Sequence, residues 1–366
     1  MTSLTVWVSA AIAAIAVAEP KPTVAVLLSL VIGTAGGALF YYWRLPLPWM
    51  LGSMIFVSAC AFSGVPVRRY MPLRNIMVVV LGILLGSFFT AGALDNLSTW
   101  GGALLVMLVY VIVTTTVAVF IFRRLGYMDA TTAYFSSTPG GLGIMAIAGE
   151  QAGADSRLIP IAHATRVFLV VFSIPLYFVT VVGVEVPSLS VLPTPETSYP
   201  DFKEIILLSG CGLAGFWLAS RLGLAFGQIL IPMVLSAIVY NFDLVNTPLP
   251  TPVVTIAQVV IGSAIGAQFR GMRPRSMFRP AIAAFVATII MLAVAVGLAQ
   301  LLAPVLNISE EALLLALAPG GLAEMSLIAI SMDSDTAFIA TLHIFRITMI
   351  AAAGPALFQL LRNLRN

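Results

Sequence analysis

Charged residues are scarce in this chain. Asp, Glu, Lys and Arg make up 9% of its 366 residues, whereas soluble domains carry about 25%. Hydrophobic residues make up 60%, and the mean hydropathy is +1.06. A soluble globule cannot hide that much apolar surface, so the composition predicts an integral membrane protein in contact with the lipid bilayer. The net charge of +3 is scattered between apolar runs, which gives no basic patch for nucleic acid.

Cysteine and histidine are also rare, with two of each. Cys60 and Cys211 lie far apart within apolar runs, so we expect neither a disulfide nor a metal-ligand pair. A copper or di-iron site needs several His, Asp, Glu or Cys ligands, and the clustered candidates near the expected membrane depth are the two histidines, Glu324 and Glu150. Neither His-Glu-x-x-His nor Gly-x-Ser-x-Gly occurs. We therefore expect no enzyme activity, no metal and no cofactor.

Long apolar runs fill most of the chain, and a spanning helix needs about 20 such residues. Residues 1–22 predict an extra N-terminal membrane helix rather than a cleaved signal peptide, because no Lys or Arg precedes the apolar run. The one long polar stretch, 185–203, is rich in Pro, Ser and Thr and predicts a linker. The other apolar segments are 23–43, 47–64, 75–94, 100–122, 129–154, 158–184, 204–220, 225–241, 252–268, 280–303, 310–332 and 336–361.

The two halves of the chain repeat with an offset of 180 residues, and both histidines of the chain fall in register. We therefore predict that 23–184 and 204–366 are two copies of one unit. The matching residues include Pro139 and Pro319, Gly140 and Gly320, Gly141 and Gly321, Leu142 and Leu322, Met145 and Met325, Asp155 and Asp335, His163 and His343, and Arg166 and Arg346.

Segments 129–154 and 310–332 decide the orientation of the copies. Each has Pro-Gly-Gly near its middle, which an uninterrupted spanning helix avoids, so we expect two re-entrant hairpins. Each copy then has five crossings, and the second is inverted. With the N-terminus outside, fourteen Lys and Arg fall on the cytoplasmic side and only Arg44 and Lys203 outside, as the positive-inside rule requires. Crossing segments would give nine against seven.

The predicted fold is thus an all-α integral membrane protein with about 11 transmembrane helices plus two re-entrant hairpins, arranged as two inverted repeats. The linker is external and the C-terminus cytoplasmic.

Two His-x-x-Arg pairs lie inside apolar helices. His163 and Arg166 share a helix face, as do His343 and Arg346. An arginine within a membrane segment costs about 2.5–3.5 kcal/mol and usually faces a cavity or a partner, so we predict that these four residues bind the substrate. The alternative is that each arginine ties its helix to backbone carbonyls at the hairpin break, or pairs with Glu324.

Each Pro-Gly-Gly tract predicts a half-helix that begins at Leu142 or Leu322 and points its positive end at the site. Two such ends and two arginines would trap a small anion. The glycines also suit close helix packing. Glu324, whose counterpart is Ile144, would carry a coupling proton or sodium ion, or neutralise an arginine. The predicted tip residues are Ser137, Thr138, Pro139, Gly140, Gly141, Pro319, Gly320, Gly321 and Glu324.

Asp155 and Asp335 stand just before the two His-x-x-Arg helices. A short acidic side chain at that position typically accepts a hydrogen bond from the first free N–H groups of a helix. We therefore predict that both cap their helices.

The tracts 137–145 and 317–325, each followed by His-x-x-Arg, resemble the bacterial AbrB membrane-protein family over residues 23–361. The resemblance implies a duplicated membrane unit in the bacterial inner membrane. Members are often labelled ammonia monooxygenases and are also named as regulators of gene expression. The residues themselves favour an elevator-like secondary transporter of a small anion such as a carboxylate, coupled to a proton or ion gradient. The alternative is a membrane-embedded sensor without transport. A homodimer is the expected assembly.

Overall fold

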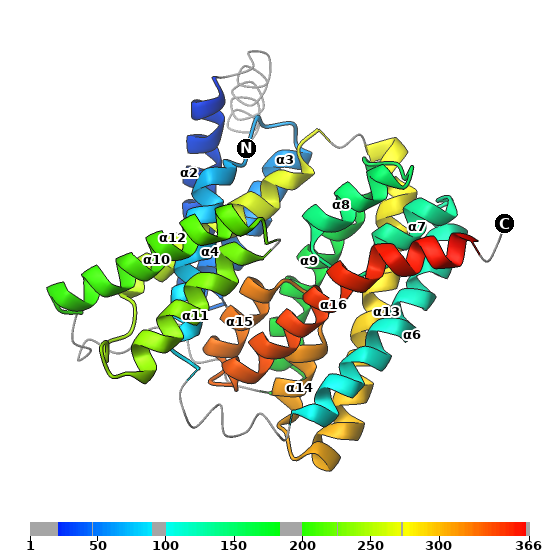
Figure 1. Cartoon of the computed structure of the whole chain (residues 1–366). Helices are drawn as coiled ribbons and strands as arrows, with labels where there is room; N and C mark the ends of the chain where they lie inside the picture. The colour runs from blue at the N-terminus through cyan, green and yellow to red at the C-terminus, as the bar shows by residue number, and fades with distance from the viewer. Residues whose placement is uncertain are drawn as a thin grey trace. The chain divides into compact units, whose positions relative to one another are not determined.

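The computed structural model describes residues 21–45, 47–89, 100–183, 200–224, 226–271 and 274–363. These residues form fourteen α-helices with one π-helical and one 3₁₀ turn, so the described chain is all-α (Figure 1). Nearly all of the predicted N-terminal helix over 1–22, and most of the predicted linker over 185–203, lie outside the described residues.

The helices follow one another without strands in the described part of the chain. Their bounds are α2 (Pro22–Tyr42), α3 (Pro48–Phe62), α4 (Met71–Gly86), α6 (Gly101–Arg124), α7 (Ala130–Ser137), α8 (Leu142–Gln151), α9 (Leu158–Tyr177), the π turn η2 (Phe178–Val182), α10 (Phe202–Leu222), α11 (Gly227–Asn241), α12 (Thr251–Gly266), the 3₁₀ turn η3 (Ala267–Phe269), α13 (Pro274–Leu306), α14 (Glu310–Leu317), α15 (Leu322–Ser331) and α16 (Thr336–Asn363).

Seven stretches of the described chain are helical, long and apolar enough to cross a membrane, so the protein is a multi-pass membrane protein. They are Pro22–Tyr42, Gly101–Arg124, Leu158–Val182, Phe202–Leu222, Thr251–Phe269, Phe278–Leu306 and Thr336–Leu360.

Three further predicted crossings coincide with the shorter apolar helices α3, α4 and α11, which have 15, 16 and 15 residues. Helix α4 begins before the predicted residue 75 because Pro72 fits a first helical turn, where its missing N–H is not needed. The count of about 11 crossings stays a prediction.

The chain divides into two compact units. The first contains α2, α3, the start of α4, and α12 with η3. The second contains the end of α4 and all the other helices. Helix α4 passes from the first unit to the second between Val80 and Leu81.

Small residues hold the helices of the first unit close together. A Cβ added at Gly52 of α3 would overlap the backbone of Gly36 in α2, and one at Gly266 of α12 would meet the backbone of Met54 at 2.7 Å. Small side chains let helix backbones approach in lipid, where no hydrophobic effect drives helices together. Close backbone contact therefore stabilises this unit.

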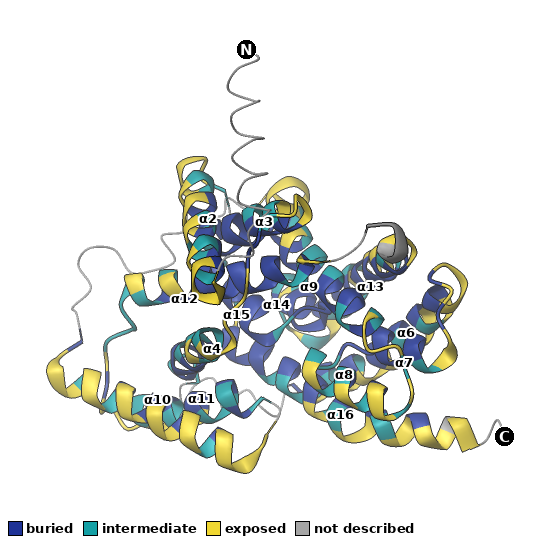
Figure 2. Cartoon of the chain, turned by 90° about the horizontal axis from the view of Figure 1, so that it is seen from above, coloured by how far each residue is buried: buried dark blue, intermediate teal, exposed yellow. Residues whose placement is uncertain are grey.

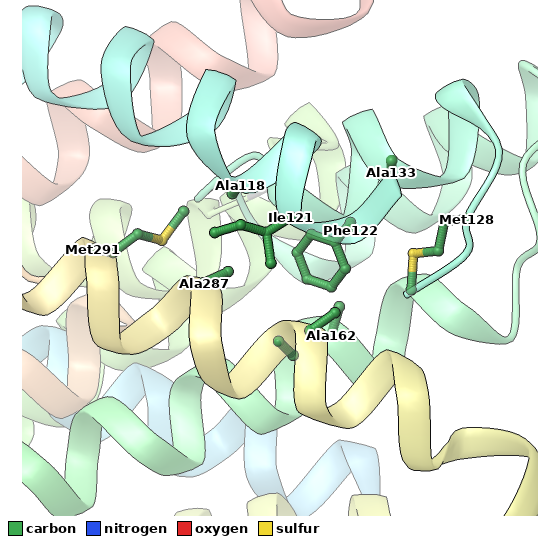
Figure 3. Packing of buried hydrophobic residues seen from close by; sticks show 10 residues of the cluster. Ala118, Ile121, Phe122, Met128, Ala133, Ala162, Ala287 and Met291 are labelled. Atoms are coloured by element: carbon green, nitrogen blue, oxygen red, sulfur yellow. The ribbon is translucent and has the colours of Figure 1, made fainter. Parts of the chain in front are cut away.

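The second unit has a core of alanine, methionine and larger apolar side chains between α6, α7, α9 and α13 (Figure 3). Ala287 and Met291 of α13 pack there against Ile121 and Phe122 of α6. Helices α14 and α15 are buried along most of their length (Figure 2). The broken helical segments predicted to form the site thus lie inside this unit.

We predict that Gly52→Ala destabilises the protein by about 1–3 kcal/mol, because the new methyl meets backbone atoms that cannot move aside. Thermal unfolding in one detergent measures the effect. The matched control is Gly210→Ala in α10, where a Cβ would have no neighbour within 4 Å. The control should be neutral or slightly stabilising. Equal stability of the two variants would contradict the close α2–α3 contact.

Candidate functional site

Two helical segments of the second unit are broken at Pro-Gly-Gly. Helix α7 ends at Ser137 and α8 begins at Leu142, while α14 ends at Leu317 and α15 begins at Leu322. The starts of α8 and α15 are the residues that the sequence predicts. We call Thr138–Gly141 the first break and Ala318–Gly321 the second break. The bounds of the two pairs of helices differ by 180 residues throughout.

Local chemistry explains where the helices stop. Thr138 and Ala318 each precede a proline and have extended backbone, with ψ of 122° and 134°. A residue before proline avoids the helical region because the proline ring crowds it. The last carbonyls of α7 and α14 consequently lack the N–H groups that a continuing helix would supply.

The arginines supply those missing donors. Arg166 Nη1 of α9 donates to the carbonyl oxygens of Ser137 and Thr138 at 3.4 and 3.3 Å. Arg346 of α16 donates from Nη1 to Ala318 O and from Nη2 to Gly320 O, both at 2.5 Å. The two side chains are 6% and 1% exposed. Each guanidinium therefore joins a spanning helix to the break beside it.

The histidines hold the arginines in place. His163 Nε2 lies 3.0 Å from Phe135 O and its Nδ1 lies 3.0 Å from Arg166 Nη2. His343 makes the same contacts with Leu315 O and Arg346 Nη2, at 3.0 and 3.1 Å. A carbonyl only accepts and a guanidinium only donates, which assigns the ring proton to Nε2 and leaves both rings neutral. In this geometry the histidines position the arginines.

The predicted alternative of an ion pair between an arginine and Glu324 is wrong in this structure. Among the described residues neither Arg166 nor Arg346 lies within 4.0 Å of an acidic oxygen, because backbone carbonyls occupy their Nη donors. Glu324, 6% exposed, folds back on its own helix instead. A Cβ added at Gly321 would overlap its carboxylate oxygen.

The hydroxyl groups at the first break bond to their own helix. Ser137 Oγ donates to Ala133 O at 2.6 Å, and Thr138 Oγ1 donates to Tyr134 O at 3.0 Å. Thr138 Oγ1 also lies 3.3 Å from Met145 Sδ of α8, and among the described residues no hydrogen bond joins either hydroxyl to the second break. Their predicted role as substrate ligands stays a prediction.

The arginines from the two halves lie close enough for their charges to interact, and both interact with the Tyr110 hydroxyl. Tyr110 is buried in α6 and donates to Met291 O of α13 at 3.2 Å. Arg166, Arg346 and Tyr110 thus lie within electrostatic range of one another, and in the described chain no hydrogen bond joins any two of them. The sequence analysis missed Tyr110, although a tyrosine within an apolar span is itself a signal, because its hydroxyl needs a partner.

The two breaks differ in accessibility. Gly140 and Gly141 of the first break and Leu142 at the start of α8 are half-buried, and Gly143 is exposed with open space where a Cβ would stand. At the second break Leu322 to Ala329 are buried, and Glu324 covers Gly321. Of the two breaks, the first is thus followed by a partly exposed helix start and the second by a buried one.

Phe226, just before α11, is the second residue that the sequence analysis missed. Its ring lies against Gly141, where any Cβ would overlap it. It also lines a cavity of about 20 Å³ with Leu230, Leu322, Ile344, Ile347 and Thr348. That volume holds about one water molecule. Phe226 therefore contacts the first break and shares this cavity with Leu322 at the second. No local pattern marks Phe226, because its contacts come from distant segments.

One of the two predicted acidic caps is confirmed: Asp335 accepts from Phe338 N at 3.0 Å at the start of α16. The cap predicted for Asp155 is wrong, because Asp155 accepts from Arg157 N at 2.9 Å, before α9 begins at Leu158, and α9 has no side-chain cap. Both cysteines are free, as predicted. No group of three His, Cys, Asp or Glu side chains suited to a metal ion occurs within the described ranges.

Long apolar helices, together with two helices broken at Pro-Gly-Gly in one unit, define a multi-pass membrane protein with internal helix ends. A family model described as "Transition state regulatory protein AbrB" matches residues 49–362, so the chain belongs to this family, as the tracts around the two breaks suggest. The chain is 26% identical to "Uncharacterized protein YhjN" of Bacillus subtilis, over 91% of this chain and 92% of that protein. It is 25% identical to "Putative regulator AbrB" of Escherichia coli, over 86% and 90%.

We predict that Arg346→Ala lowers the unfolding free energy by at least about 2 kcal/mol, because two buried carbonyls lose their donors at about 1–3 kcal/mol each. Arg346→Lys should lie between that variant and wild type, since an ammonium lacks the planar fork. Chemical unfolding in detergent measures both. Arg157→Ala, an exposed arginine before α9, is the control and should change stability by less than about 0.5 kcal/mol. If Arg346→Ala proved as stable as this control, the claim that Arg346 stabilises the second break would be contradicted.

Proposed function

We propose that the protein is a secondary transporter of a small anionic solute such as a carboxylate, coupled to a proton or ion gradient. One observation carries the proposal: a helix broken at Pro-Gly-Gly and braced by His-x-x-Arg occurs twice in one unit, 180 residues apart. Broken helices whose ends meet at the interface of two repeats are typical of substrate sites in secondary transporters.

We further propose that the chain is two inverted repeats, 23–184 and 204–366, each with five crossings and a re-entrant hairpin at 129–154 or 310–332. Recurrence of helix bounds at the same offset supports the duplication. The distribution of Lys and Arg supports inversion, with the N-terminus outside and the C-terminus cytoplasmic. Alternating access would come from an elevator-like or rocking movement of one bundle against the other about the site.

The first break supplies the chemistry for an anion. The N–H groups of Leu142, Gly143 and Ile144 open helix α8 and have no acceptor in the described part of the chain. Such a helix start favours negative charge through its free donors and its dipole. Arg166 Nε is buried without a partner close to the same break. A carboxylate or similar oxyanion would satisfy these donors.

Because of Glu324, we propose a different role for the second break. A buried carboxylate without a cation is costly, and no Lys, Arg or His pairs with Glu324 among the described residues. The carboxylate already lies at the start of α15, where a substrate anion would otherwise bind. We propose that Glu324 takes the coupling proton or sodium ion while the first break takes the solute.

The substrate site is tested at Ile144, the counterpart of Glu324. Ile144→Glu should place a tethered carboxylate at the start of α8, where it competes with the solute and lowers uptake about tenfold or more. Ile144→Gln has the same length without the charge and should retain uptake. The measurement is uptake of radiolabelled acetate, lactate and succinate into proteoliposomes. Equal effects of the two variants would contradict an anion site at the first break.

The coupling role is tested at Glu324. Glu324→Gln keeps the shape of the side chain but cannot bind a proton or sodium ion as a carboxylate does. We expect it to exchange solute across a proteoliposome membrane without gradient-driven accumulation. Glu150→Gln, an exposed carboxylate at the other end of α8, should accumulate solute as wild type does. Accumulation of solute by the Glu324→Gln variant at the wild-type level would contradict the proposal that Glu324 binds the coupling ion.

The rival function is a membrane sensor or regulator that binds a ligand without moving it. The name of the Escherichia coli relative, "Putative regulator AbrB", and the family description favour it. The two functions separate in the same proteoliposomes. Binding of a probe anion without flux, under proton and sodium gradients of either direction, would favour the sensor.

A further inference from the structure

A basic hollow lies at the end of helix α6, within the second unit. It encloses about 380 Å³ and is lined by Thr116, Val119, Phe120, Arg123, Arg124 and Met128. That volume falls within the range of about 300–1,000 Å³ that is typical of small-molecule sites. Neither the substrate site nor the two breaks share any of these residues.

Five of the six lining residues form one face of α6, which changes from apolar at Val119 and Phe120 to basic at the C-terminal end of the helix. Thr116, the pair Val119 and Phe120, and the pair Arg123 and Arg124 follow at three- to four-residue spacing, so they lie one above another over about 12 Å. Helix α6 is one of the candidate membrane spans and ends at Arg124. When α6 spans a bilayer, its terminal arginines would lie at the membrane surface and the apolar part of the hollow beside the hydrocarbon.

The positive charge of the hollow is uncompensated by acidic side chains of the described chain. Neither Arg123 nor Arg124 forms an ion pair there, and the nearby Asp129 instead accepts from Thr132 N at the start of α7. The Arg124 guanidinium stacks over Phe120, 5.4 Å from the ring centre, which leaves its N–H edge free. Arg279 lies 4.6 Å over the ring of Tyr127, the residue before Met128, which adds a third cation beside the hollow.

We propose that this hollow binds an anionic phospholipid. The phosphate is held by Arg123 and Arg124, and the start of one acyl chain lies along Thr116, Val119 and Phe120. Arginine donors suit phosphate oxygens, and basic pockets beside membrane helices bind anionic head groups. Phe120 is 62% exposed although it lies within a candidate membrane span. In a bilayer its ring would therefore contact a lipid acyl chain. The proposal requires membrane insertion and does not depend on transport.

The test measures bound lipid on the intact protein. Native mass spectrometry of the full chain, purified from nanodiscs of phosphatidylcholine with one fifth phosphatidylglycerol, counts retained phosphatidylglycerol. Arg123→Gln with Arg124→Gln should weaken that binding about 30-fold, since each basic residue contributes about a factor of five near a membrane surface. Arg221→Gln is the matched control: it removes another arginine from the last turn of an apolar helix, stacked over Trp217 at 5.2 Å. The control should retain the lipid.

Two further measurements separate a lipid from a free phosphate. Phe120→Ala should weaken binding of phosphatidylglycerol while both arginines remain, and inorganic phosphate at the same concentration should not displace the lipid. A double arginine variant that retains phosphatidylglycerol as wild type does would overturn the proposal. So would full displacement by inorganic phosphate with no effect of Phe120→Ala, which indicates an anion site alone. Thermal unfolding of each variant shows whether it is folded.

Discussion

The hydrogen bonds between a buried guanidinium and the carbonyls of a broken helix are the constraint on which the second unit depends. A helix that stops inside an apolar region leaves carbonyl oxygens without donors, and lipid supplies none. Arg166 and Arg346 provide those donors from neighbouring helices. The presence of two arginines within apolar helices is explained by the breaks that they stabilise. The histidines beside them orient each guanidinium toward the carbonyl oxygens.

This bracing leaves the opposite end of each break available. The arginines use their Nη atoms on the carbonyls that end α7 and α14, while the N–H groups that begin α8 and α15 have no acceptor in the described chain. At α15 the Glu324 carboxylate lies beside this end, and at α8 Ile144 leaves it open. This difference between Ile144 and Glu324 is the basis of the proposal that the second break takes a coupling ion and the first break takes a solute.

Features set by local chemistry were predictable from the sequence, and features set by distant packing were not. Proline and glycine mark the breaks and the starts of α8 and α15, and an aspartate marks the cap of α16, because each depends on a few neighbouring residues. The partner of each arginine was left open, because a three-residue spacing fixes a helix face but not what lies opposite. Phe226 and Tyr110 were missed for the same reason, since their contacts come from segments far away in the chain.

The central claim is that the two braced breaks enter the membrane from opposite faces and share one site. Single cysteines at two exposed positions test it most directly, in a background in which Ser replaces Cys60 and Cys211: Ser156→Cys beyond α8 and Asp333→Cys beyond α15. A membrane-impermeant thiol reagent should label Ser156→Cys only from the cytoplasmic side and Asp333→Cys only from outside. Labelling of both positions from the same side would contradict the inverted arrangement and the shared site with it.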